Sequence, residues 1–232
     1  MATWHKSDCA DFLPTIPDNS VQLIYVDPPF NSATRNWWDS KLNWKLLFQQ
    51  IFRILTENGT LVIHCSQPFT YELIREAPYA PSFHYIWNKG RSTNPFLAKI
   101  QPLRCCEEIL VWRKKKATYY PQRVGTEKRL QKSSGVGTYY GATSEQPLVE
   151  VIGRWQTHYL DYKPYHNKRD KFATRPRELV ELMIQSFSKP GDTVLDFTCY
   201  TGISGKVSLE LGRKWIGCDK YFYPLHLLQK KV

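Results

Sequence analysis

The sequence predicts an α/β fold with a mostly parallel sheet and helices on both faces. Short apolar runs alternate along the chain with segments of helical periodicity, for example 21–27 followed by 44–55. Such alternation is typical of parallel strands joined by helical crossovers. With 232 residues and 42% hydrophobic content, the chain is long enough and apolar enough for one sizeable α/β domain.

The individual elements follow from local pattern. Residues 21–27 (VQLIYVD) indicate a buried strand, because the run is apolar and rich in β-branched and aromatic side chains. Residues 44–55 repeat apolar side chains at the spacing of an amphipathic helix. Further strands are expected at 60–65, 83–89, 107–114, 192–198 and 214–219, and further helices at 70–76, 176–187, 205–212 and 223–231.

Charge is concentrated in one segment of a basic chain. The formal net charge is +11, and residues 113–171 hold 13 basic and 5 acidic residues. The same segment holds eight tyrosine and tryptophan residues, a mixture suited to gripping phosphates and stacking on bases. The alternative is a solvated, tyrosine-rich insert. Periodicity fades from about 114 to 171, so long loops with little core are expected there.

The cysteines and the apolar runs bear on the cellular compartment. None of the six cysteines forms a C-x-x-C pair, so reduced thiols in a cytoplasmic protein are expected, and no metal site is predicted. No apolar run approaches the length that spans a bilayer, and the first residues lack the apolar core of a signal peptide.

The stretch LIYVDPPFNS, residues 23–32, combines an acid with a stiff turn. A buried strand delivers Asp27, two prolines follow, and Phe30 offers an aromatic ring. Proline has a fixed φ and no N–H, so Pro28 and Pro29 present oxygen atoms on a rigid turn. Taken alone, the stretch is either a catalytic site or a proline-stiffened loop.

A second candidate site lies near the other end of the chain. In TVLDFTCYTGISG, residues 193–205, a strand ends at Asp196 and turns through small residues into a helix. The next strand, WIGCDK, ends at Asp219. A strand, a tight turn, a helix and then an acid at the next strand end is the arrangement that binds a nucleoside cofactor.

Together, the two sites resemble the amino-group DNA methyltransferases, which transfer a methyl group from S-adenosylmethionine to an exocyclic base nitrogen. D-P-P-F precedes VLDFTCYTG here, the order of the permuted β-class, in which the catalytic half comes first. The resemblance extends over most of the chain. It is carried also by SDCADFLPTIPDNSVQLIYVDPPFN, FRILTENGTLVIHCS, IWNKG, EEILVWRKK, KFATRPRELVELMI and LGRKWIGCDK.

The resemblance implies a Rossmann-like class I methyltransferase fold, circularly permuted, with a mostly parallel seven-stranded sheet. It divides the chain into a catalytic half (1–113), a basic insert for target recognition (114–171) and a cofactor-binding half (172–232). The strand missing after 214–219 would come from residues 3–6. Asp8 would then lie near the cofactor's adenine, or cap the helix that follows it, and the two roles are compatible.

The resemblance also implies roles for single residues. Asp27 and the Pro28 carbonyl would accept hydrogen bonds from the target amine, Pro29 would stiffen the turn, and Phe30 would stack on a base flipped out of the duplex. The cofactor-binding residues would be Asp8, Cys9, Asp27, Phe172, Ala173, Thr174, Arg175, Asp196, Thr198, Tyr200, Gly202, Asp219 and Lys220. The DNA-binding residues would be Lys114, Lys115, Lys116, Arg123, Lys128, Arg129 and Lys132.

One departure from the family pattern concerns the cofactor turn. Tyr200 stands where the family has its first glycine, while Gly202 is kept. Tyrosine resists positive φ, so either the turn is reshaped with Tyr200 beside the cofactor or cofactor binding is weak.

The expected reaction is N6-adenine methylation of double-stranded DNA, since the family's adenine enzymes more often begin the tetrad with aspartate. The alternatives are N4-cytosine methylation, a weaker case for RNA, and a weakly active or non-catalytic nucleic-acid-binding subunit. A homodimer or a partner methyltransferase subunit could supply sequence recognition, and the expected location is the cytoplasm, at the nucleoid of a prokaryote or phage host.

Overall fold

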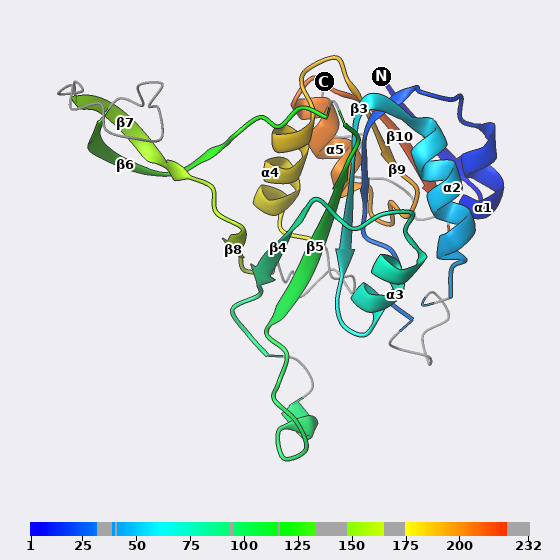
Figure 1. Ribbon diagram of the computed structural model, residues 1–232, viewed down its shortest axis with the longest axis horizontal. Helices are drawn as coiled ribbons and strands as arrows, with labels where there is room; N and C mark the ends of the chain where they lie inside the picture. The colour runs from blue at the N-terminus through cyan, green and yellow to red at the C-terminus, as the bar shows by residue number, and fades with distance from the viewer. Residues whose placement is uncertain are drawn as a thin grey trace. The chain divides into compact units, whose positions relative to one another are not determined.

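The structure is a computed structural model that describes residues 1–31, 39, 41–92, 95–115, 117–132, 148–164 and 175–221. It divides into two compact units (Figure 1). The first combines residues 1–120 with 158–232, and the second comprises residues 121–157. The first unit contains the large sheet and the helices.

The large sheet has eight strands in the order β1-β10-β9-β2-β3-β5-β4-β8. The strands are β1 (Ala2–Lys6), β2 (Val21–Val26), β3 (Leu55–Cys65), β4 (Phe83–Asn88), β5 (Cys106–Arg113), β8 (Tyr159–Asp161), β9 (Thr193–Asp196) and β10 (Lys214–Asp219). Among these described strands only β5 runs antiparallel to its neighbours, so the prediction of a mostly parallel sheet is confirmed.

The predicted number of strands, seven, is wrong. The eighth strand, β8, pairs with β4 from Ile86↔Tyr159 to Asn88↔Asp161. It has three residues and lies in the segment where the sequence has no clear periodicity. A strand this short leaves no repeating pattern, and its pairing with β4 is what defines it.

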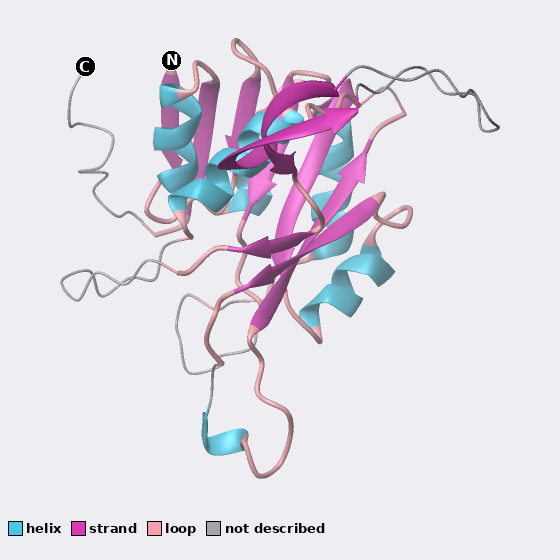
Figure 2. Ribbon diagram, turned by 90° about the vertical axis from the view of Figure 1, so that its left-hand side faces the viewer, coloured by secondary structure: helices cyan, strands magenta, loops and turns pink. Residues whose placement is uncertain are grey.

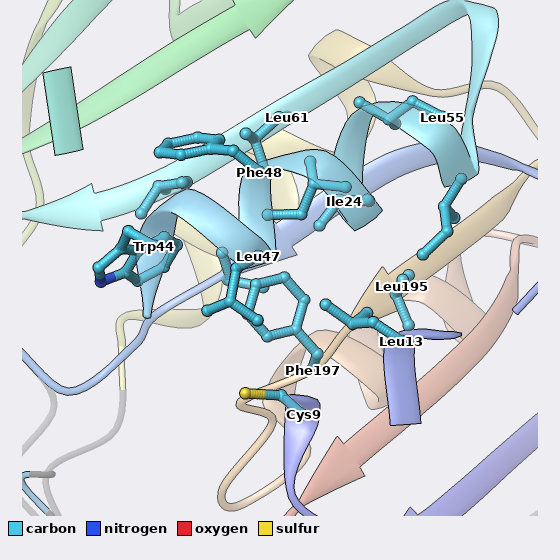
Figure 3. Packing of buried hydrophobic residues seen from close by; sticks show 14 of the residues in the cluster. Cys9, Leu13, Ile24, Trp44, Leu47, Phe48, Leu55, Leu61, Leu195 and Phe197 are labelled. Atoms are coloured by element: carbon cyan, nitrogen blue, oxygen red, sulfur yellow. The ribbon is translucent and has the colours of Figure 1, made fainter. Parts of the chain in front are cut away.

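Helices cover both faces of the sheet (Figure 2). The helices are α1 (Cys9–Phe12), α2 (Trp44–Ile54), α3 (Phe69–Glu76), α4 (Arg177–Phe187) and α5 (Ile203–Glu210), with short 3₁₀ turns at Leu13–Thr15 and Pro95–Leu97. On one face, Leu47 and Phe48 of α2 pack against Ile24 and Leu61 of the sheet (Figure 3). None of the described helices is long and apolar enough to cross a membrane.

The N-terminal strand, β1, lies beside β10, the last described strand along the chain. β1 pairs in parallel with β10 from Ala2↔Trp215 to Lys6↔Asp219, which confirms the placement expected for residues 3–6. Likewise, β2 pairs with β9 although the two are far apart in the sequence, so the two predicted sites meet at one edge. Circular permutation itself stays a prediction.

The second unit is a two-stranded antiparallel sheet of β6 (Arg123–Lys132) and β7 (Leu148–Trp155). The expectation of long loops was therefore wrong for these two stretches. Each strand is defined by pairing with the other, from Arg123↔Trp155 to Lys132↔Leu148, and the sequence pattern does not show that partner. The helix predicted at 223–231 lies outside the described residues.

Candidate active site

Asp27 follows β2 directly, at the edge where β1, β2, β3, β9 and β10 all end. The strand before it is buried, with Ile24 and Val26 fully inaccessible, so the sheet fixes the position of this carboxylate. The turn beyond is also fixed, because the backbone N–H of Asn31 donates to Asp39 Oδ1 at 2.6 Å. The pattern therefore presents the acid on a rigid support.

Phe30 does not stand alone in the structure. Its ring stacks on Phe69 of α3, with centroids 5.4 Å apart and planes 21° from parallel. Phe30 is only partly buried, so the ring remains in part accessible. The prolines before it differ in burial, Pro28 being buried and Pro29 partly exposed.

Arg175 binds the Asp27 carboxylate with both arms of its guanidinium. Nε donates to Oδ2 at 2.7 Å and Nη2 to Oδ1 at 2.5 Å, while Nη1 donates to Glu107 Oε2 at 2.5 Å. Burial lowers the pKa of Arg175, but the Asp27 and Glu107 carboxylates raise it by more than burial lowers it. The pKa of Arg175 therefore lies above its usual value. The resemblance assigned Arg175 to the cofactor; the structure places it on the proposed catalytic acid.

A buried aromatic layer lies close to this ion pair. The Arg175 guanidinium carbon is 5.0 Å from the centre of the Trp87 ring, and Trp87 meets His64 edge to face. His64 Nε2 lies 2.8 Å from the Tyr25 hydroxyl. Burial, and secondarily the charge of Arg175, hold the pKa of His64 well below its usual value, so the imidazole is neutral. Tyr25 is buried too, and its pKa is raised.

Sequence reasoning missed Glu107 and His64. His64 interrupts the apolar run TLVIHC, and Glu107 precedes the apolar core of β5. His64, a polar residue inside a buried apolar run, was the available signal, because such a group requires a partner; Glu107, at the half-buried start of β5, offered no such signal.

Asp196, at the end of β9, is held by neutral donors. Its Oδ1 accepts from the Thr198 backbone N–H at 3.1 Å, and its Oδ2 accepts from the Ser204 hydroxyl. Burial raises the pKa of Asp196 to about 7, and the nearby negative charge of Asp27 acts in the same direction. Gly202 begins the helix α5 with φ at 74°, the left-handed conformation that favours glycine.

Tyr200 adopts the conformation that a glycine would take. Its φ is 44°, and its backbone N–H donates to Asp219 Oδ2 at 2.8 Å. The second oxygen of Asp219 accepts from the Tyr221 N–H at 2.8 Å. Burial raises the pKa of Asp219, and these two hydrogen bonds partly offset that rise. The backbone at Tyr200 thus has positive φ despite the side chain.

Asp8 caps α1, which confirms that interpretation of its role. Its Oδ1 accepts from the Ala10 N–H at 3.0 Å, and its Oδ2 lies 3.1 Å from Lys220 Nζ. The pair joins the end of β1 to the end of β10. The Cys9 side chain lies in the apolar core, and Phe172, Ala173 and Thr174 lie outside the described residues.

The predicted DNA contacts fall in two places. β5 runs antiparallel to β3, so Lys114 and Lys115 lie at the sheet edge opposite Asp27, where Lys114 Nζ donates to the Leu55 carbonyl at 2.6 Å. The structure does not bring these two lysines together with Asp27. The other predicted residues fall on the β6–β7 unit, treated next.

On the β6–β7 unit, Arg123 lies 3.9 Å above the Trp155 ring and Lys128 pairs with Glu150 at 3.0 Å. Arg129 is on the same strand, β6. Lys116 and the side chain of Lys132 lie outside the described part of the chain.

The sheet order is that of a class I methyltransferase fold. Solved structures share this fold. The M1.HpyAVI–SAM complex aligns with 96% of this chain and 95% of its own, at a TM-score of 0.60 and 20% identity. The PvuII DNA methyltransferase, described as cytosine-N4-specific, aligns with 95% of this chain and 82% of its own. The TM-score is 0.65 and the sequence identity is 15%.

A family model described as a DNA methylase of the N6/N4 type matches residues 21–229, and the chain belongs to this family. It is accordingly an amino-group DNA methyltransferase. The Type II methyltransferase M1.MboII of Moraxella bovis is 28% identical over 237 residues, covering 93% of this chain and 90% of that protein.

Proposed function

We propose that the protein methylates the exocyclic N6 of an adenine flipped out of double-stranded DNA, with Asp27 as the catalytic residue. The observation that carries this proposal is the position of Asp27 on a rigid turn at the end of β2, beside the cofactor turn after β9. The acid that would hold the amine and the turn that would hold the methyl donor are thus on neighbouring strands.

An exocyclic amine is a poor nucleophile because its lone pair is delocalised into the ring. Hydrogen bonds from its two N–H groups to the Asp27 carboxylate and the Pro28 carbonyl favour a tetrahedral nitrogen with a directed lone pair. Orientation matters greatly for such a transfer and can contribute several kcal/mol. Phe30 would hold the base plane by stacking, at roughly 1–3 kcal/mol.

S-Adenosylmethionine supplies an activated methyl group on a positively charged sulfur. The residues at the neighbouring strand ends fit this cofactor. Asp219 has a carboxylate suited to ribose hydroxyls, and the left-handed turn through Tyr200 and Gly202 opens α5 at the same edge. Asp196, Thr198 and Ser204 hold this turn in shape.

Adenine is the first choice of target because aspartate begins the D-P-P-F tetrad. N4-cytosine is the second candidate, and the similarity to the cytosine-N4-specific PvuII enzyme favours keeping it. A weakly active or non-catalytic subunit is the third, on the ground of Tyr200. We infer that residues 121–157 contact DNA, with Arg123, Lys128 and Arg129 on β6, and place the protein in the cytoplasm as part of a restriction–modification system.

The test is methyl transfer from labelled S-adenosylmethionine to duplex DNA, followed by digestion to nucleosides and mass spectrometry. N6-methyladenine supports the proposal, and N4-methylcytosine replaces it with the second candidate. A chain without measurable cofactor affinity, alone or with DNA, would refute the enzymatic role.

The DNA interface can be tested by salt dependence. Neutralising Arg123, Lys128 and Arg129 to glutamine should lower the slope of log K against log salt by about 0.9 for each phosphate that the variant no longer neutralises. Lys214→Gln is the matched control, since Lys214 is an exposed residue at the start of β10 in the other unit and is not among the predicted DNA contacts. An unchanged slope in the triple variant would remove β6 from the proposed DNA interface.

A further inference from the structure

Four charged side chains form a row at the catalytic edge, alternately negative and positive. Arg175 joins Asp27 to Glu107, and the other oxygen of Glu107, Oε1, lies 2.9 Å from Lys89 Nζ. The side chains of Lys89 and Glu107 are each 13% exposed and that of Arg175 is 16% exposed, against 35% for Asp27. Asp27 is therefore the end of the row that a substrate could reach.

The row fixes the plane of the guanidinium. Two of its nitrogens bind Asp27 and the third binds Glu107, so rotation would break bonds on both sides. Trp87 lies opposite Glu107 in the β4–β5 register, and its ring contacts the same guanidinium. The Trp87 indole N–H in turn donates to the Tyr162 carbonyl at 2.7 Å. Arg175 is thus held by Glu107 of β5 and Trp87 of β4 in addition to Asp27.

We propose that Glu107 and Lys89 are positioning residues that act on Asp27 through Arg175. Without the negative charge of Glu107, the guanidinium keeps only Asp27 as a carboxylate partner and is free to tilt towards it, because a fork of donors follows its remaining acceptor. The Asp27 oxygens would then turn away from the direction in which they meet the amine. The inference rests on the proposed function of Asp27 and adds a second layer to it.

The test compares Glu107→Gln with wild type at saturating DNA and cofactor. We expect kcat to fall by about 10- to 100-fold, as is usual when a supporting partner is removed at other sites, while the cofactor KM changes by less than about threefold. Arg177→Gln is the matched control. Arg177 lies two residues after Arg175 in the sequence but pairs with Glu210 on α5, so this variant should keep wild-type turnover. Wild-type kcat in Glu107→Gln would overturn the proposal.

A rescue experiment distinguishes positioning from general stability. Arg175→Ala should lose most transfer, and free guanidinium at low, non-denaturing concentration should restore part of it, whereas ammonium should not, because only guanidinium can bridge both carboxylates. Equal rescue by ammonium, or none in a folded variant, would contradict the bridging role.

A third readout does not depend on transfer, so its failure is separable from failure of the proposed function. The melting temperatures of Asp27→Asn, Glu107→Gln and the double variant should be non-additive, because both acids share Arg175. Additive shifts would overturn the shared network even if the enzyme is active.

A different observation carries a second proposal, which also rests on the proposed function. The described residues between β4 and β5, 89–92 and 95–105, emerge at the same edge as Asp27 and include the short helical turn at the bottom of Figures 1 and 2. On this loop Phe96 is 93% exposed and Ile100 78% exposed. Residues 89–105 include four basic residues and no acidic one.

Hydrogen bonds within the loop and at its base hold the described part of it in place. The Pro95–Leu97 turn is closed by the Ala98 N–H donating to the Pro95 carbonyl at 3.1 Å. At its base, Arg104 Nη1 donates to the Gln67 carbonyl at 2.8 Å, two residues before Phe69, on which Phe30 stacks. The loop is therefore connected to the residues that would hold the flipped base.

We infer that Phe96 inserts between base pairs of duplex DNA and fills the gap that a flipped base leaves. Exposed apolar side chains on a basic loop match this partner, since apolar wedges enter the base stack while cations meet the phosphates. Wild type should bind a duplex containing an abasic gap about tenfold or more tightly than the intact duplex. Phe96→Ser should lose that preference and Phe96→Leu should keep it.

Equal preference in wild type and Phe96→Ser would overturn the insertion. Affinity is measured without methyl transfer, so this result stands apart from that of the methylation assay. Phe96→Ser should also slow transfer on intact duplex while sparing an unpaired target, and equal slowing on both substrates would contradict the wedge.

Discussion

Asp27 and Asp196 end neighbouring strands at one edge, yet they are stabilised in opposite ways. Asp27 is held by the guanidinium of Arg175, a full positive charge. Asp196 is held by a hydroxyl and a backbone N–H, both neutral, in a fully buried position where its pKa rises to about 7. The comparison separates two arrangements of one residue type: Asp27 pairs with a cation and stays partly exposed, whereas the buried Asp196 accepts from neutral donors and shapes a turn.

The largest effect on methyl transfer should come from replacing Asp27, the acid paired with Arg175. Asp27→Ala removes the acceptor of the amine, so transfer should fall by about 10³-fold or more, while cofactor affinity stays within a few-fold. Turnover is measured with labelled cofactor, and affinity by calorimetry. Wild-type-like turnover in Asp27→Ala would contradict the proposed catalytic role of Asp27 and, with it, the contrast with Asp196.

A smaller effect is expected from an acid on the cofactor side. Asp219→Asn keeps one acceptor for the turn but loses the charge suited to ribose hydroxyls, so cofactor affinity should fall about tenfold with a lesser change in kcat. Cofactor titration and turnover assays of Asp27→Ala and Asp219→Asn check whether the first lowers mainly kcat and the second mainly cofactor affinity. If Asp219→Asn lowered kcat and left affinity intact, the division of tasks would be wrong.

The neutral surroundings of Asp196 predict a dependence of stability on pH. Its pKa is raised from 3.8 in the unfolded chain to about 7 in the folded one, so the folded state binds the extra proton between these values. The stabilisation is fully present below the unfolded pKa and is lost as pH rises through about 7.

Between pH 5 and 8 the melting temperature of wild type should therefore fall by roughly 5 °C more than that of Asp196→Asn, which cannot titrate. Thermal melts across this range provide the measurement. Parallel curves would show that Asp196 does not titrate between pH 5 and 8 in the folded protein.

The smallest effect concerns the turn between these acids. Tyr200→Gly should raise the free energy of unfolding by about 0.5–1 kcal/mol, because glycine takes a φ of 44° without strain. Denaturant unfolding measures it, and cofactor titration shows whether the side chain restricts binding. A loss of stability of similar size would mean that packing of the tyrosine outweighs the backbone strain.

Local pattern predicted much of the fold and the position of Asp27, the proposed catalytic acid. Val21 to Val26 is a buried apolar run, and Asp27 follows it in a motif that defines its own turn. Residues 3–6 were placed beside β10 because the resemblance required a strand there, and the structure confirms it.

What the sequence did not show depends on partners distant along the chain. Arg175 reaches Asp27, and Tyr25 reaches His64, through tertiary contacts that leave no spacing pattern. The same holds for β6 and β7, each of which is defined by its pairing with the other. Tyr200 occupies a left-handed position through its hydrogen bond to Asp219, against the preference of its residue type.

The charged row has a consequence for how the family can vary. Exchanging Glu107 alone would break its ion pairs with Arg175 and Lys89, and exchanging Arg175 alone would break its ion pairs with Asp27 and Glu107. Both losses fall at largely buried positions and are destabilising. Positions 107 and 175 should therefore covary among relatives, with pairs of changes tolerated where single changes are not. Position 89, which pairs with the far oxygen of Glu107, should follow them more loosely.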